Sequence, residues 1–206
     1  MKKAVAMLLV LLVGAFALGQ DAPKKSKARR TVVVRGVQFP SRLDIVVDAS
    51  GSMFGLKFAR AVTEARRIAS SFTDAGHVRF HAFADNLTTE PQGWIALPDA
   101  TAVTKATLFL AGLQDVNGGT CMFQALENLL AQESEQELGV IIITDAAPYG
   151  GAEGTAKAIV ALNEKRKSPA VIGVIAIEPA EADEALGKEL SKTGGGYMKI
   201  TTPKDF

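Results

Sequence analysis

The sequence predicts an α/β fold: a three-layer, doubly wound α/β/α architecture with a mostly parallel sheet between two helical layers. Short β-branched runs alternate along the chain with longer segments whose apolar residues recur near the helical period. The most continuous run, residues 140–143, has no polar residue and is typical of a central strand buried on both faces. The turn residues 91–93 indicate a hairpin that places one antiparallel strand at a sheet edge.

The expected strands are short apolar runs bounded by glycine, proline or polar residues. They cover residues 31–37, 43–47, 78–84, 94–97, 140–143, 170–177 and 197–200. The expected helices have apolar residues three and four positions apart. They cover residues 56–72, 101–113, 122–132, 155–165 and 181–192.

The first helix shows the helical period most clearly. Its inward face is expected to hold apolar residues, namely Leu56, Ala59, Val62, Ala65, Ile68 and Phe72. Its charged residues are expected to face solvent, namely Lys57, Arg60, Glu64 and Arg67.

The beginning of the chain resembles an export signal followed by a linker. Residues 1–19 have the layout of a secretory signal peptide, in which Lys2 and Lys3 precede an apolar stretch and small residues offer cleavage sites. The stretch is short for a membrane span of about 20 residues, and an uncleaved anchor is the alternative. Residues 20–30 are basic and lack apolar partners, so we expect a flexible linker, with a tether to a polyanion as the alternative. We therefore expect a secreted, periplasmic or cell-envelope protein.

The remaining residues, 31–206, suit a single domain with a sizeable core. The net charge is +1 and becomes −1 if Lys2 and Lys3 are removed with the signal peptide. A balance this close to neutral provides no general attraction to nucleic acid or to acidic membranes. The single cysteine, Cys121, excludes an internal disulfide. We interpret it as small, buried and inert, and the alternative is a reactive or intermolecularly paired thiol at a helix N-terminus.

Oxygen-bearing side chains collect where the expected strands reach the carboxyl edge of the sheet. Asp48, Ser50 and Ser52 follow one β-branched run directly, and Asp145 follows another. Thr120 lies on a glycine-rich loop that we expect at the same edge. Ligands of parallel α/β sheets bind at this edge, and hard oxygen atoms suit a small divalent cation. The sequence therefore predicts a metal site there.

These motifs resemble those of the von Willebrand factor A domain family. The resemblance is carried, in the family's order, by Asp48-Ala49-Ser50-Gly51-Ser52, Gly118-Gly119-Thr120 and Ile143-Thr144-Asp145. In that family these residues form a metal-ion-dependent adhesion site. The resemblance implies that Ser50 and Ser52 bind Mg²⁺ or Mn²⁺ directly. It also implies that Asp48 and Asp145 act mostly through bound water and that Thr120 joins them in an open form. The family usually has glycine where this chain has Ala146.

The function that this resemblance implies is metal-dependent protein binding. Neutral hydroxyl ligands leave much of the cation's charge uncompensated, so the metal can bridge to an Asp or Glu carboxylate of a partner protein. Met53 and Phe54 lie beside the site in the sequence and are candidates for partner contact. An open–closed shift that couples the Thr120 loop to the last helix is a further family property. The alternative is a metal-free domain of the same fold that acts as a structural interaction scaffold.

No catalytic residue is expected in this chain. A nucleophilic serine needs a nearby base, and the histidines, His77 and His81, lie on or beside a strand that we expect to be remote from the site. We interpret His81 as a sheet residue with satisfied hydrogen bonds. Gly118-Gly119 is not followed by the Lys-Ser/Thr of a phosphate-binding loop. The aromatic residues Phe80, Phe83 and Trp94 are interpreted as packing residues.

Overall fold

The structure is a computed structural model that describes residues 31–72, 75–113, 118–132, 135–145, 151–179 and 184–201. The predicted signal peptide and linker fall on residues 1–30 and lie outside the described residues. Within the described ranges, every helix is too short or too polar to cross a bilayer.

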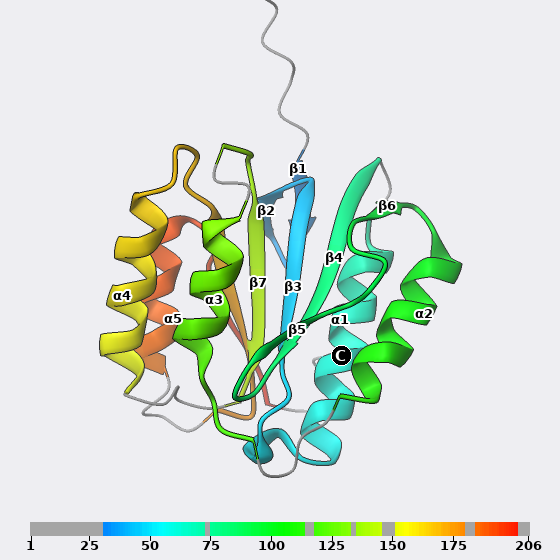
Figure 1. The fold of residues 1–206 in the computed structure, drawn as a ribbon, viewed down its shortest axis with the longest axis horizontal. Helices are drawn as coiled ribbons and strands as arrows, with labels where there is room; N and C mark the ends of the chain where they lie inside the picture. The colour runs from blue at the N-terminus through cyan, green and yellow to red at the C-terminus, as the bar shows by residue number, and fades with distance from the viewer. Residues whose placement is uncertain are drawn as a thin grey trace, which may run out of the picture.

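The predicted three-layer α/β/α fold is confirmed (Figure 1). Its sheet has the order β5-β4-β3-β7-β8-β9. The parallel strands are β3 (Arg42–Asp48), β4 (Gly76–Phe83), β7 (Gly139–Thr144), β8 (Val171–Ile177) and β9 (Tyr197–Ile200). Two short strands pair with β4 in the antiparallel direction, β5 (Leu87–Thr89) and the expected β6 (Ile95–Leu97).

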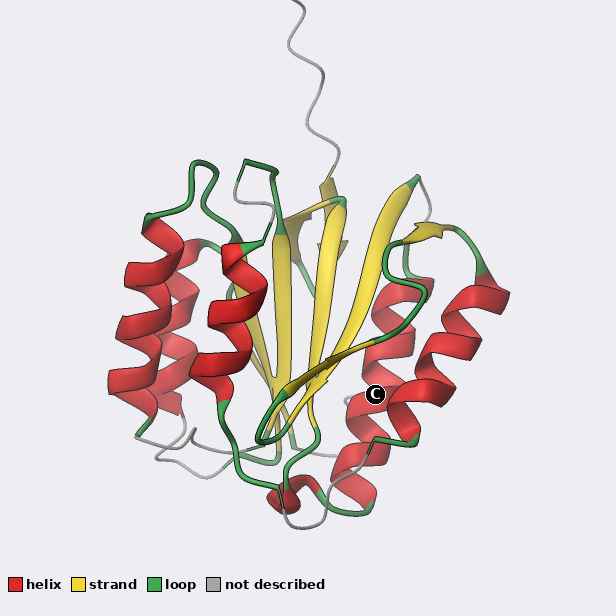
Figure 2. Ribbon diagram, in the orientation of Figure 1, coloured by secondary structure: helices red, strands yellow, loops and turns green. Residues whose placement is uncertain are grey.

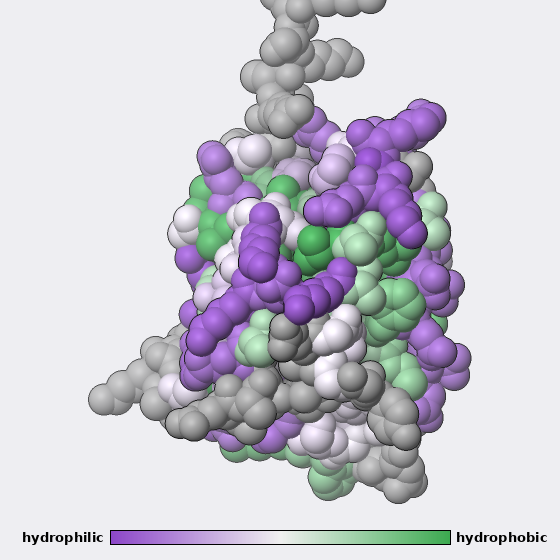
Figure 3. All heavy atoms as spheres, turned by 90° about the vertical axis from the view of Figure 1, so that its left-hand side faces the viewer, coloured by the Kyte–Doolittle hydropathy of each residue, from purple (hydrophilic) through white to green (hydrophobic). Residues whose placement is uncertain are grey.

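Helices cover both faces of the sheet (Figure 2). One face packs against α1 (Leu56–Ser70) and α2 (Ala100–Ala111). The other packs against α3 (Met122–Ala131), α4 (Ala152–Glu164) and α5 (Glu184–Leu190), which precedes the short turn η3 (Ser191–Thr193). Successive side chains of a strand point to opposite faces of the sheet. The central strands are therefore apolar on both faces, because each face packs against a layer of helices. The outer side of α4 and α5 shows hydrophilic areas with hydrophobic areas between them (Figure 3).

The leading strand predicted over residues 31–37 is wrong in its extent. The chain turns back at Arg35 and Gly36, where φ is 47° and 83°, and forms the hairpin of β1 (Thr31–Val34) and β2 (Val37–Pro40). Two consecutive left-handed residues are what a tight hairpin turn requires. The hairpin packs its Phe39 ring against β7 and β8 because Gly139 and Gly173 have no side chain: a Cβ there would lie 3.3 Å and 2.7 Å from Phe39.

The hairpin also explains an error in the predicted faces of α1. Glu64 was expected in solvent, but it is buried. It accepts hydrogen bonds from Arg35 at 2.8 and 3.1 Å and from Arg67 at 2.8 and 2.6 Å. Burial raises the pKa of Glu64, but the arginine hydrogen bonds and charges outweigh it and leave this pKa below its ordinary value.

Leu56 was expected in the core and is 65% exposed instead.

A buried charged cluster joins β3 to β4. Arg79 donates two hydrogen bonds to Asp44, of 2.8 and 3.1 Å. The two ring nitrogens of His81 lie 3.0 Å from Asp44 Oδ1 and 2.9 Å from Thr89 Oγ1, which confirms the prediction that His81 is a satisfied sheet residue. The Arg79 guanidinium lies 4.4 Å from the centre of the Trp94 ring. Burial raises the pKa of Asp44, but the hydrogen bonds and charges of His81 and Arg79 together outweigh burial and leave this pKa below its ordinary value.

Candidate metal centre

Asp48 is the last residue of β3 and is fully buried at the carboxyl edge of the sheet. Its Oδ1 accepts the backbone N–H of Ser50 at 2.9 Å, and its Oδ2 accepts the Thr144 hydroxyl at 2.6 Å. These bonds hold the carboxylate between the ends of β3 and β7. Burial raises the pKa of Asp48 to about 6, and the nearby charge of Asp145 adds to that rise. The site therefore contains a carboxylate whose negative charge is poorly compensated by the protein alone.

The two serines connect Asp48 to the second aspartate. Ser50 Oγ lies 3.2 Å from Ser52 Oγ, and Ser52 Oγ donates to Asp145 Oδ1 at 2.9 Å. The short turn η1 (Gly51–Met53) brings the serines together, and Met53 is fully buried beneath it. The structure thus brings four of the five predicted residues into one cluster of oxygen atoms.

The loop that carries Thr120 lies beside this cluster. Gly118 O accepts the backbone N–H of Gly51 at 3.0 Å, and Asp85 Oδ1 accepts the N–H of Gly119 at 2.9 Å. The half-buried Thr120 is therefore at the predicted edge, but among the described residues no hydrogen bond joins its side chain to the cluster. Half-buried Cys121 follows, and its N–H donates to Ala84 O at 2.9 Å. The predicted burial of Cys121 is therefore only partial, and its inertness stays a prediction. Ala146 lies outside the described residues.

The oxygen spacing fits a small octahedral cation. Six oxygens at about 2.1 Å from a central ion place neighbouring oxygens about 3 Å apart. The Ser50 and Ser52 hydroxyl oxygens are 3.2 Å apart, so both can bind one such ion. In the part of the chain that the structure describes, no three His, Cys, Asp or Glu side chains group as a metal cluster. The site offers hydroxyl and carboxylate oxygens, which are ligands of the kind that small divalent cations prefer.

Three residues that shape this site had not been predicted to take part in it. Lys57, expected in solvent, places its Nζ 2.5 Å from Asp145 Oδ2. Thr144 fixes Asp48, and Asp85 anchors the Thr120 loop. Asp85 had a detectable signal, because it closely follows the strand expected over residues 78–84, at the same sheet edge.

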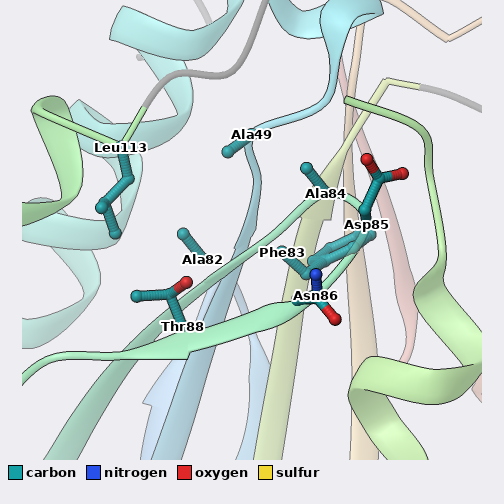
Figure 4. Close-up of a pocket in the computed structure, with 8 residues that line it drawn as sticks. All are labelled: Ala49, Ala82, Phe83, Ala84, Asp85, Asn86, Thr88 and Leu113. Atoms are coloured by element: carbon teal, nitrogen blue, oxygen red, sulfur yellow. The ribbon is translucent and has the colours of Figure 1, made fainter. Parts of the chain in front are cut away.

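A cavity of about 220 Å³ lies next to the site, between the carboxyl ends of β3 and β4 and Leu113, which follows α2. Leu113 lies on one side of it and Asp85 on the other, with Ala49 and Ala82 between them (Figure 4). The alanines have small side chains, which leaves this space open at the ends of β3 and β4. The remaining lining residues are Phe83, Ala84, Asn86 and Thr88.

The fold and these motifs define the class of protein. The sequence model of the von Willebrand factor type A domain family matches residues 43–206. The chain belongs to this family, as the motifs predicted. The β1–β2 hairpin precedes the matched region. Among curated proteins, none matches this chain in sequence.

Solved structures share the fold at low sequence identity. BatB from Bacteroides thetaiotaomicron is 21% identical with a TM-score of 0.58, over 80% of this chain and 92% of that one. A von Willebrand factor type A protein from Catenulispora acidiphila is 18% identical with a TM-score of 0.61, over 82% of this chain and 41% of that one. Proximal thread matrix protein 1 from the mussel byssus, with zinc in its metal-ion-dependent adhesion motif, is 18% identical with a TM-score of 0.54, over 77% of this chain and 41% of that one.

Proposed function

We propose that this domain is an exported protein-binding module that depends on a divalent metal, Mg²⁺ or Mn²⁺. The observation that carries the proposal is the oxygen cluster, in which the Ser50 and Ser52 hydroxyls lie 3.2 Å apart, as two adjacent ligands of one small cation would, and Asp145 accepts the Ser52 hydroxyl at 2.9 Å. Ser50 and Ser52 would hold the metal directly, and Asp48 and Asp145 would hold it mostly through water. When bound, the metal supplies a positive charge that can accept a carboxylate oxygen from an Asp or Glu of the partner.

The surface beside the cluster also suits protein contact. Phe54 directly follows η1 and Leu56 begins α1, and they are 62% and 65% exposed. Exposed apolar side chains next to a charged site are typical of a protein interface. Met53 was the other candidate for partner contact, but its side chain is fully buried and supports the turn instead.

A binding role agrees better with the surroundings of the serines than a catalytic role. Both ring nitrogens of His81 are engaged by Asp44 and Thr89 within the sheet, so His81 is not poised to activate Ser50 as a base. The second candidate function is the metal-free interaction scaffold. The contact between Lys57 and Asp145 favours it, because a protein cation already compensates that carboxylate.

Titration calorimetry with Mn²⁺ distinguishes the two functions. We expect heat of binding for the wild type and none for Asp145→Ala. Glu127→Ala is the matched control, because it removes an exposed carboxylate on the outer side of α3. A wild type that takes up no Mn²⁺ would contradict the proposed metal dependence.

Partner binding is tested by capture from an envelope fraction of the source cell. Capture should be lost with chelator, return with added Mn²⁺, and fail with Asp145→Ala. The same partner bound equally well with and without chelator would favour the scaffold.

A further inference from the structure

Lys57 makes the closest contact to Asp145 from within the site. It lies in the first turn of α1, just after the serine loop, and its Nζ is 2.5 Å from Asp145 Oδ2. The other carboxylate oxygen accepts the Ser52 hydroxyl at 2.9 Å. Both oxygens of Asp145 therefore have a partner, one neutral and one charged.

Burial makes this ammonium group important. The Asp145 side chain is 2% exposed, and its charge acts on Asp48, the other carboxylate of the site. Two carboxylates close together and shielded from water need a positive charge nearby. Lys57 provides that charge from a side chain that is 32% exposed, so it can leave toward solvent without disrupting the core.

We propose that Lys57 is an internal counter-ion that competes with the divalent metal for Asp145 and thereby sets the metal affinity. This inference rests on the proposed metal dependence and adds its regulation. The ammonium and a divalent cation repel each other at one carboxylate, so the metal-competent form is the one in which Lys57 has left. The apparent affinity for the metal is then the intrinsic affinity multiplied by the fraction of molecules in that form.

Metal binding by charge variants of Lys57 tests the competition. If Lys57 leaves Asp145 in about one molecule in ten, Lys57→Gln lowers the Mn²⁺ dissociation constant about tenfold in titration calorimetry. Lys57→Arg keeps the positive charge and should stay near the wild type. Lys105→Gln is the control, since Lys105 is an exposed lysine on α2. Circular dichroism establishes that each variant is folded.

A second measurement uses the wild type alone. Acetylation of Lys57 by an amine-reactive ester, quantified by mass spectrometry, should rise as Mn²⁺ saturates the site, while that of Lys105 stays constant.

Each result has a defined meaning. Tighter Mn²⁺ binding by Lys57→Gln than by the wild type supports the competition. Equal or weaker binding by Lys57→Gln, or unchanged acetylation of Lys57 at saturating Mn²⁺, overturns it and leaves the proposed metal dependence standing. No binding by either folded protein overturns both proposals.

Discussion

Replacing Asp44 by Asn should destabilise the domain strongly, although Asp44 lies outside the candidate metal centre. The substitution removes the charge that faces Arg79, whose side chain is only 10% exposed and which makes two hydrogen bonds to this carboxylate. Breaking a buried ion pair on one side costs about 3–5 kcal/mol, because the remaining charge is left uncompensated. Asn can still accept one hydrogen bond, so we expect a loss of about 3 kcal/mol in the free energy of unfolding.

Urea unfolding at neutral pH measures this loss, and Glu64→Gln is the matched control. Glu64 is equally buried and also holds arginines, but the Arg35 and Arg67 side chains are 22% and 41% exposed and can turn toward water. The control should therefore lose less, about 1–2 kcal/mol. If Asp44→Asn loses no more unfolding free energy than Glu64→Gln, the deeper burial of Arg79 does not determine the cost.

The ion pair between Asp44 and Arg79 also predicts that stability depends on pH. The pKa of Asp44 in the folded protein is below its ordinary value of 3.8. Its ion pair therefore contributes stability above that value and loses this contribution as the pH falls through the folded-state pKa. The stability advantage of the wild type over Asp44→Asn should shrink as the pH falls below about 3.8. An unchanged advantage at lower pH would show that Asp44 is not the titrating group.

Three further substitutions test packing and loop anchoring. Met53→Ala empties a fully buried position beneath the serine turn and should lower the free energy of unfolding in urea by about 2–4 kcal/mol. Gly173→Ala would place a Cβ 2.4 Å from the carbonyl oxygen of Gly195, so we expect the free energy of unfolding, measured by thermal unfolding, to fall by about 1–3 kcal/mol. No change in stability would show that the two backbone segments can move apart. Asp85→Ala removes the acceptor of the Gly119 N–H and should weaken Mn²⁺ binding in calorimetry by a few-fold without preventing folding.

The sheet and most of the candidate site could be predicted because both depend on local signals. Strands and helices follow from the spacing of apolar residues, and Asp48 and Asp145 are placed by the rule that parallel strands end at one edge. The roles of Glu64 and Lys57 could not be predicted in this way. Helical periodicity assigns charged residues to solvent, but each of these side chains meets a partner distant in sequence, Arg35 for the first and Asp145 for the second.

The two tight glycine contacts had no local signal either, and the hairpin had only Gly36 within an otherwise strand-like run. Gly139 and Gly173 look like ordinary strand residues until Phe39 is placed against them. The turn at Arg35 requires a positive φ at a residue that rarely adopts it, so a continuous strand was the simpler expectation. Such features depend on tertiary contacts, which a single sequence does not encode in its periodicity.

The position of the β1–β2 hairpin has a mechanical consequence. Thr31 pairs with Pro40 and shares a cavity with Glu137 and Pro169, near the starts of β7 and β8, so it lies at the end of the sheet opposite Asp48 and Asp145 (Figure 1). A pull between Thr31 and a bound partner would act along β3. The hairpin would open one residue pair at a time from Thr31, whereas β3 would resist along its whole length through its hydrogen bonds to β4 and β7 together. The hairpin would therefore yield at a lower tension than the sheet and would lengthen the connection while β3 and the candidate metal centre stay intact.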